Sequence, residues 1–240
     1  MAKYGIDAPG VIRNLLLLAG VGVLLAALAP HLPMGATDVQ RVGSIAASFA
    51  VMLGLQGLAM LWTSLGGKRI AARQLVDRAG LNGSEQVLDI GCGRGLLLIE
   101  AARRLKSGRA VGLDLWNMAD LSGNNRGATE ANIVAEGVAE RISLLDGDMC
   151  RMPFADGSFD RVISSLALHN VYTPAQRALA LAEIIRVLRP GGQILLQDFR
   201  HTSEYQRALQ SAGLLGVRRT LVNPLLMFPP TWRVEARKAG

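Results

Sequence analysis

Several residue types are scarce in this 240-residue sequence, and each scarcity excludes a class of protein. Two cysteines, Cys92 and Cys150, cannot build a disulfide framework and lack the spacing of metal ligands, so they favour a reducing compartment and predict no metal site. Aromatic residues make up 5% of the chain, which provides no obvious platform for stacked bases. The net charge of +7 comes from basic residues scattered among acidic ones. We therefore expect no nucleic-acid partner, and an anionic membrane surface instead.

Charge is almost absent from the first 67 residues, whereas residues 68–240 hold 40 charged side chains. The few charges leave two uncharged runs, of 17 residues at 14–30 and of 26 residues at 42–67. As helices these runs would be about 25 and 39 Å long, against a hydrocarbon core of about 30 Å. The sequence thus predicts a membrane anchor with two transmembrane helices in residues 1–67 and a globular domain in residues 68–240.

Basic residues beside the two runs predict how the anchor is oriented. Lys3 and Arg13 precede the first run, and a basic cluster that begins with Lys68 and Arg69 follows the second. The loop between the runs contains a single basic residue, Arg41, apart from the titratable histidine. By the positive-inside rule both ends of the chain face the cytoplasm. We expect an integral membrane protein, of the inner membrane in a bacterium, with the domain on the cytoplasmic side.

Other interpretations of the hairpin stay open at this point. Basic residues, an apolar stretch and the small residues at positions 27–29 also describe a signal peptide with its cleavage site. A buried soluble hairpin would need a larger core than this chain offers. Ala46, Ala50 and Gly54 form a small-residue stripe that suits close helix contact, either between the two runs or in a homo-oligomer.

Beyond residue 67 apolar strands alternate with helical periodicity, which is typical of a mostly parallel sheet covered on both faces. Predicted strands lie at residues 86–90, 109–114, 142–145, 161–165 and 193–197, with short β segments near 217–222 and 233–236. Predicted helices lie at residues 69–79, 95–106, 128–137, 174–188 and 203–212. The fold class is therefore α/β and Rossmann-like, preceded by two transmembrane helices.

A glycine-rich turn follows the first predicted strand of the domain. Gly91, Gly93 and Gly95 provide positive φ and close approach of a ligand to the backbone, and Asp89 precedes them by two residues. Leu96 occupies the place of the last glycine of a dinucleotide fingerprint, and no Gly-Lys-Ser/Thr sequence follows. The turn therefore predicts neither a dinucleotide site nor a phosphate-binding loop.

The next two predicted strands also end at acidic residues. Asp114, nineteen residues after Gly95, stands where a carboxylate accepts the hydroxyls of a ribose. Asp148, after the third strand, is placed to receive the exocyclic amine of adenine, with Met149 and Trp116 beside the ring. Because the carboxyl ends of parallel strands meet at one edge of the sheet, we expect these residues to form one site.

Together these motifs resemble the class I S-adenosylmethionine-dependent methyltransferases, most of all the branch with ubiquinone and menaquinone methyltransferases. The resemblance covers roughly residues 84–200 and rests on residues 87–95, Asp114, 147–149, 152–160 and 183–192. It implies a seven-stranded sheet with the last strand antiparallel and S-adenosyl-L-methionine as the cofactor.

The resemblance also implies a role for each residue of the cofactor site. Asp89 and the backbone of the glycine turn would meet the methionine end of the cofactor, Asp114 the ribose and Asp148 the adenine. Ser165, which ends the fourth predicted strand, is assigned to the same site. The polar insertion at residues 121–125 either folds over the cofactor or forms a solvated loop.

Two histidine-containing segments are candidates for the acceptor side. His169 is the best candidate base and Asn170 could orient it or the acceptor, although His169 could equally hydrogen-bond only a loop carbonyl or the cofactor. His201 and Tyr205, after the fifth predicted strand, are candidates for a catalytic group and an acceptor contact. Methyl transfer needs mainly alignment and exclusion of water, so a base is needed only where the acceptor carries a proton.

The combined prediction is a membrane-anchored methyltransferase that acts on a lipophilic small molecule, such as a quinone-, phenol- or lipid-like acceptor. The apolar loop at residues 223–230 would wall the acceptor pocket or dip into the bilayer lipids. Two alternatives remain: a methyltransferase of a small soluble amine or thiol that the hairpin only localises, and a non-catalytic membrane scaffold that binds the cofactor.

Overall fold

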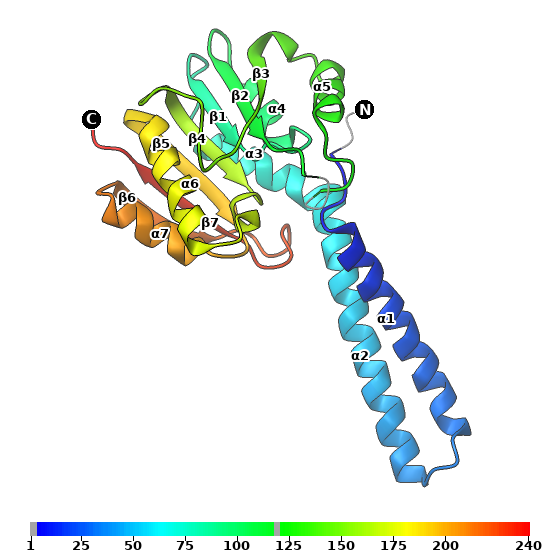
Figure 1. Ribbon diagram of the computed structural model, residues 1–240. Helices are drawn as coiled ribbons and strands as arrows, with labels where there is room; N and C mark the ends of the chain where they lie inside the picture. Colours follow the sequence, from blue (N-terminus) through cyan, green and yellow to red (C-terminus); the bar gives the residue numbers. More distant parts are fainter. Residues whose placement is uncertain (1–3, 118–120) are drawn as a thin grey trace.

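Two long apolar helices leave an α/β domain as an antiparallel hairpin (Figure 1). The computed structural model describes residues 4–117 and 121–240, so Lys3 lies outside the described residues. Helix α1 spans Pro9–Leu28, the 3-10 turn η1 spans Ala29–His31 and helix α2 spans Ala36–Trp62. A π-helical turn, η2, spans Thr63–Gly67 and leads without a break into α3, which spans Lys68–Arg78. One continuous helix therefore runs from the hairpin into the domain.

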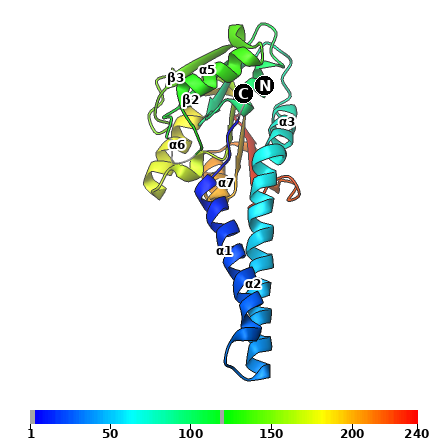
Figure 2. The same cartoon turned by 90° about the vertical axis from the view of Figure 1, so that its right-hand side faces the viewer.

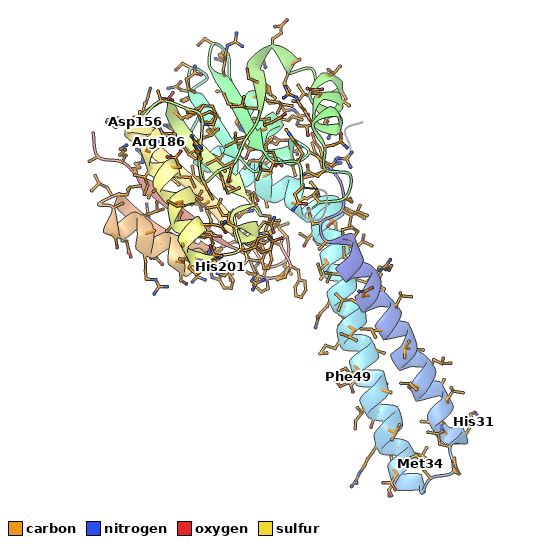
Figure 3. The ribbon with its side chains drawn as sticks, in the orientation of Figure 1. His31, Met34, Phe49, Asp156, Arg186 and His201 are labelled. Carbon is orange, nitrogen blue, oxygen red and sulfur yellow. The ribbon has the colours of Figure 1, made fainter. Side chains whose placement is uncertain are left out.

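Small residues bring the two hairpin helices together. A Cβ added to Gly22 of α1 would lie 3.0 Å from the Ala50 Cβ and 3.0 Å from the Ala46 carbonyl oxygen of α2. The small-residue stripe thus faces α1, the first of its two expected partners. Most large apolar side chains point outward, as Figure 3 shows for Phe49, whose side chain is 57% exposed. By length and apolar composition both helices could cross a membrane, and 17% of the most apolar window of each is buried.

The domain contains the predicted seven-stranded sheet, in the order β3-β2-β1-β4-β5-β7-β6. Neighbouring strands from β3 to β5 are parallel, and β7 is antiparallel to both β5 and β6. The bounds are β1 Gln86–Ile90, β2 Arg109–Asp114, β3 Ile142–Asp146, β4 Phe159–Ser165, β5 Leu188–Asp198, β6 Leu215–Leu221 and β7 Trp232–Arg237. The strand order reverses between β1 and β4, which is where open α/β sheets bind ligands.

Helices cover both faces of this sheet (Figure 2). Alternate residues of one strand point to opposite faces, so Val87 packs in the core beneath α3 and α4 (Leu96–Ala102) while Leu88 packs beneath α6 (Pro174–Val187) and α7 (Thr202–Ser211). Helix α5, Arg126–Ala135, lies on the α4 face through Ile133. Strands buried on both faces are continuous apolar runs, and this explains why the sequence predicted them.

Element ends differ from the prediction by a few residues, each for a local reason. Helix α5 begins two residues early because the Asn125 side chain accepts a hydrogen bond from the Ala128 N–H at 2.8 Å and caps the helix. Strand β5 begins five residues early because Leu188 pairs with Phe159 before a register shift.

The loop between β6 and β7 is attached to the base of the hairpin. The Trp62 indole N–H donates to the Leu225 carbonyl at 2.8 Å, and the Phe228 N–H donates to the Thr63 hydroxyl at 2.8 Å. Gly67 allows the helix backbone to lie against Leu226, because a Cβ at this position would overlap the Leu226 carbonyl oxygen. Figure 2 shows this loop beside the junction of α2 and α3.

We expect Gly67→Ala to separate the β6–β7 loop from the helix and to lower the free energy of unfolding by about 1–3 kcal/mol, the usual cost of overpacking against backbone. Gly54→Ala is the matched control, because its Cβ would lie 3.8 Å from the Ala19 Cβ, an ordinary contact. Thermal unfolding of both variants in the same detergent is the measurement, and equal midpoints would contradict the expectation.

Candidate functional site

A cavity of about 340 Å³ opens at the carboxyl ends of β1, β2 and β4. Most residues that the sequence assigned to a cofactor line it: Asp89, Gly91, Gly93, Asp114, Asp148, Met149 and Ser165. Asn170, assigned to the acceptor, lines it as well. Residues that are far apart in the sequence thus meet at the strand ends, as parallel topology requires.

The glycine turn brings bare backbone to this cavity. Gly91, Gly93 and Gly95 have φ values of 68°, 50° and 81°, all in the left-handed region. A Cβ on Gly91 would overlap the Ala167 side chain, so only glycine fits there. The Gly91 and Gly93 N–H groups donate to residues at the end of β2, which fixes the turn. Gly95 precedes α4 and lies outside the cavity lining, and a Cβ on it would lie 3.1 Å from the Thr129 side chain of α5.

Asp89 is a buried acid at the floor of the cavity. Its side chain is 1% exposed, and Oδ2 has no hydrogen-bond partner among the described residues. Burial, with a smaller effect of the Asp114 charge, raises the pKa of Asp89 to about 8, although a hydrogen bond from the Leu98 backbone acts in the other direction. An unpartnered buried carboxyl fits a ligand that brings a cation or a hydrogen-bond donor, as the ammonium of S-adenosylmethionine does.

Asp114 is held by three donors of its own chain. Its carboxylate accepts the Gly93 N–H at 2.7 Å, the Trp116 N–H at 2.6 Å and the Asn124 side-chain amide at 3.4 Å. A carboxylate has about four lone-pair positions, so it keeps room for a ribose hydroxyl. Asn124 and Leu121 line the cavity, so one side of the insertion lies against the candidate cofactor site, whereas Gly123 and Asn125 are exposed to solvent.

The two residues proposed to flank an adenine ring lie differently. Met149 lines the cavity, and next to it the Asp148 carboxylate accepts the Cys150 N–H at 2.8 Å with one oxygen. Trp116 lies outside the lining: its indole N–H donates to Asp146 at 2.8 Å and its ring packs on the core beneath α4. Ser165 receives a hydrogen bond from the Gln197 amide at 3.3 Å.

Three residues assigned to the acceptor side lie outside the cavity lining, around the buried carboxylate of Asp198. His169 Nδ1 lies 2.8 Å from Asp198 Oδ1, and the His169 ring centroid is 4.5 Å from that of Phe199. Tyr205 is fully buried and donates to Asp198 Oδ2 at 3.4 Å, and burial raises its pKa well above the ordinary value. His201 lies at the edge of the domain in Figure 3, and partial burial lowers its pKa.

Sequence reasoning missed the segment that closes the cavity from the N-terminal side. Tyr4 and Asp7, just before α1, and Lys68, just after η2, all line the cavity. Lys68 is 8% exposed, and its ammonium donates to the Tyr4 carbonyl at 3.0 Å, the Gly5 carbonyl at 2.9 Å and the Asp7 carboxylate at 3.1 Å. The only indication of this contact in the sequence is that Asp7 and Lys68, of opposite charge, lie at the two ends of the hairpin where it joins the domain.

Further hydrogen bonds hold the same segment on both sides. The Ser64 hydroxyl donates to the Asp7 carboxylate at 3.2 Å and accepts the Asp7 N–H at 3.1 Å. On the domain side, the Ile6 N–H donates to the Ser122 hydroxyl at 2.9 Å, and Asp7 forms a β-bridge with Leu121. Residues 4–7 therefore join the base of the hairpin to the insertion.

Comparison with known proteins agrees with this fold. Residues 88–196 match the family described as a methyltransferase domain. The demethylmenaquinone methyltransferase of Beutenbergia cavernae is 36% identical over 138 residues, which are 57% of this chain and 50% of that protein. The chloroplastic 2-phytyl-1,4-beta-naphthoquinone methyltransferase of Arabidopsis thaliana is 32% identical over 142 residues, 59% of this chain and 52% of that protein. The chain thus spans about half the length of these curated relatives.

Solved structures share the fold at low sequence identity. A methyltransferase dependent on S-adenosylmethionine from Aquifex aeolicus has a TM-score of 0.55 and 17% identity, covering 69% of this chain and 88% of that one. A geranyl diphosphate methyltransferase solved with the same cofactor has a TM-score of 0.55 and 17% identity, covering 71% and 85%. A 4+2 cyclase has a TM-score of 0.58 and 16% identity, covering 71% and 81%, so this fold alone does not determine the reaction.

We expect cofactor binding to weaken as the pH falls from 7 to 5.5. Below pH 8 the Asp89 carboxyl is protonated in the free protein, and a cationic ligand favours its ionised form, so binding must release a proton. The affinity should fall by up to about tenfold per pH unit, in a range where the cofactor amine stays protonated. Calorimetry in buffers of different ionisation enthalpy measures the released proton. Asp89→Asn should lose this pH dependence, and a flat wild-type profile would contradict the assignment.

We expect Lys68→Met to release residues 4–7 from the cavity and to weaken binding of S-adenosylhomocysteine at least about tenfold, because it leaves the Asp7 carboxylate partly buried without its cation. Lys106→Met, which removes the same charge from an exposed position, is the control. Calorimetry and hydrogen exchange of residues 4–7 are the measurements. A folded Lys68→Met protein with wild-type affinity would exclude this role.

The cavity at the strand ends, the matched methyltransferase domain and the shared fold all support S-adenosylmethionine as the ligand of this site. The unpartnered Asp89 oxygen, the side-chain-free glycine turn and Asp114 fit an ammonium, a methionine chain and a ribose. The domain, in which residues 88–196 match a methyltransferase domain, has the fold and the site of a class I S-adenosylmethionine-dependent methyltransferase, and its cavity fits S-adenosylmethionine as the cofactor.

Proposed function

We propose that this chain is a membrane-anchored methyltransferase of a lipophilic small molecule, with a quinone-like acceptor as the first choice. Two relatives that match the domain are named for the methylation of demethylmenaquinone and of a phytyl naphthoquinone, both ring systems with long apolar tails. Because the matched segment covers about half of those proteins, the acceptor is carried to this chain as part of the proposal.

The observation that carries the proposal is the continuity between the apolar hairpin and the cavity wall. Helix α2 continues through η2 into α3, and Lys68 at the start of α3 lines the cavity. A site at the base of a membrane anchor receives acceptors that are concentrated in the bilayer, so anchoring raises their effective concentration at the site.

The exposed surface of the hairpin supports a membrane anchor in residues 1–67 and a catalytic domain in residues 68–240. A core helix of a soluble protein would be mostly buried, whereas most residues in the apolar windows of α1 and α2 are exposed. A cleaved signal peptide fits less well, because its removal would take Tyr4 and Asp7 away from the cavity. Positive residues after α2 support a cytoplasmic position for the domain, by the positive-inside rule.

The cofactor, when bound, supplies an electrophilic methyl group on a sulfonium centre. The residues of the chain have to align the acceptor with it and keep water out. Asn170, Val171 and Tyr172 line the cavity after β4 and are placed to position an acceptor. His169 Nδ1 lies 2.8 Å from Asp198 Oδ1 but makes no hydrogen bond among the described residues. In this proposal the ring turns to form that bond, and Nε2 then takes the acceptor proton where the acceptor is a phenol or hydroquinone.

The groups around Asp198 have different roles in this proposal. Tyr205 is buried on the far side of Asp198, so it acts through that carboxylate as a positioning residue and has no direct contact with the acceptor. The His201 Nδ1 atom lies 3.9 Å from Glu204, and the half-buried side chain lies outside the lining of the cofactor cavity. His169→Ala should therefore lower kcat, and Tyr205→Phe should change it only slightly.

The soluble-acceptor alternative cannot be separated by deleting residues 1–67, because that deletion removes part of the cavity wall. We expect the full chain in lipid nanodiscs, with radiolabelled cofactor, to methylate a long-tailed naphthohydroquinone with at least about tenfold higher kcat/KM than its tail-less analogue. Scintillation counting of extracted lipids is the measurement. Asp114→Ala, which removes a cofactor ligand, is the control for background.

Two results would contradict the proposal in different ways. Equal turnover of tail-less and long-tailed acceptors, or label transferred only to soluble amines or thiols, would favour an enzyme that the hairpin merely localises. Cofactor binding without transfer to any extracted molecule would favour a non-catalytic role of the domain.

A further inference from the structure

A second cavity, of about 380 Å³, lies between α3 and the β6–β7 edge of the sheet, apart from the cofactor cavity. Arg78 at the end of α3 and Arg233 on β7 both line it, together with Gln74 and Asn223. None of these four residues lines the cofactor cavity. The cavity thus combines two guanidinium groups with two amides, all of which can donate hydrogen bonds.

Arg233 is a buried cation with an unused donor. Arg233 is 5% exposed, and its Nε atom has no hydrogen-bond partner among the described residues. Burial lowers the pKa of Arg233, and the neighbouring positive charge of Arg78 lowers it further. A guanidinium that is removed from water beside a like charge is unfavourable unless an anion approaches it.

Two residues next to Arg233 in the sheet also have a buried polar atom without a hydrogen-bond partner. Thr220 on β6 and Gln197 on β5 are the register partners of Arg233, so all three side chains point to the α3 face. Thr220 Oγ1 and Gln197 Oε1 also lack partners among the described residues. Neither Thr220 nor Gln197 lines the second cavity, so the unpartnered Nε of Arg233 is the donor that a group bound there would satisfy.

The acids near this cavity are engaged elsewhere. Asp77 lines the cavity, but its Oδ1 accepts hydrogen bonds from Arg104 at 2.6 and 3.0 Å. Glu235 stabilises the charge of Arg233 and also lies 3.9 Å from Arg218. The positive charge of Arg78 and Arg233 together therefore exceeds what these carboxylates neutralise locally.

We propose that this cavity binds a phosphate group, held between Arg78 and Arg233, and that the phosphate belongs to the headgroup of an anionic phospholipid. Paired guanidinium groups match the geometry and charge of phosphate. Asn223, at the mouth, begins the loop that is bonded to Trp62 at the end of α2. Leu221 and Leu225 beside the mouth are 52% and 79% exposed and offer an apolar surface to acyl chains. The lipid source rests on the proposed membrane anchor.

The test uses the full chain in a mild detergent and calorimetric titration with dihexanoylphosphatidylglycerol, dihexanoylphosphatidylcholine and inorganic phosphate. Wild-type protein should bind one phosphatidylglycerol more tightly than either of the other two. Arg78→Gln and Arg233→Gln should each weaken this binding at least about tenfold, because each removes charge-assisted hydrogen bonds. Arg207→Gln, which removes an equal charge from an exposed position on α7, should bind as the wild type does.

Arg78 is exposed, so Arg78→Gln keeps the test informative even where Arg233→Gln fails to fold. Equal binding of inorganic phosphate and phosphatidylglycerol would preserve the phosphate site and overturn its lipid source. Wild-type binding of both by Arg78→Gln would overturn the site itself. Affinity for S-adenosylhomocysteine should be unchanged in Arg78→Gln, which separates a failure here from a failure of the proposed function.

Discussion

The ammonium of Lys68 links the parts of this protein that act together. It is buried at the start of α3, and its hydrogen bonds hold the segment that precedes α1 against the cavity. A buried lysine retains its charge only when carbonyl and carboxylate oxygens replace water around it. Tyr4, Gly5 and Asp7 supply those oxygens, so the open end of the hairpin and the wall of the cofactor cavity form one structure.

This link changes what the hairpin can do. A simple anchor could be cut off without effect on the domain. Here both segments that join the hairpin to the domain line the cavity, with Tyr4 and Asp7 on one side and Lys68 on the other, and Ser64 is hydrogen-bonded to Asp7. Movement of α1 relative to α2 would therefore displace residues that line the cofactor cavity. The β6–β7 loop adds a second attachment through Trp62, which restricts how the domain can rotate on its stem.

The two acids of the cofactor cavity show how position determines chemistry in otherwise similar side chains. Asp114 is satisfied by backbone N–H groups and presents a carboxylate ready to accept hydroxyls. Asp89 has an unpartnered oxygen and a raised pKa, so a cationic ligand would stabilise its ionised form and supply the missing hydrogen-bond partner. A 4+2 cyclase shares this fold, so the fold by itself does not determine the reaction.

The sequence alone determined whatever depends on local pattern. Uncharged runs predicted the long helices, buried parallel strands appeared as apolar runs, and the turn from Gly91 to Gly95 followed by Asp114 predicted the cofactor end of the site, because a strand, a turn and a helix are adjacent in the chain. Only the tertiary structure decided which distant residues meet. Lys68 reaches Tyr4 because the hairpin returns the chain to its start, and Thr220, Arg233 and Gln197 align because antiparallel pairing sets their register. Loop side chains such as His169 are directed by packing on Asp198 and Phe199, which no local pattern encodes.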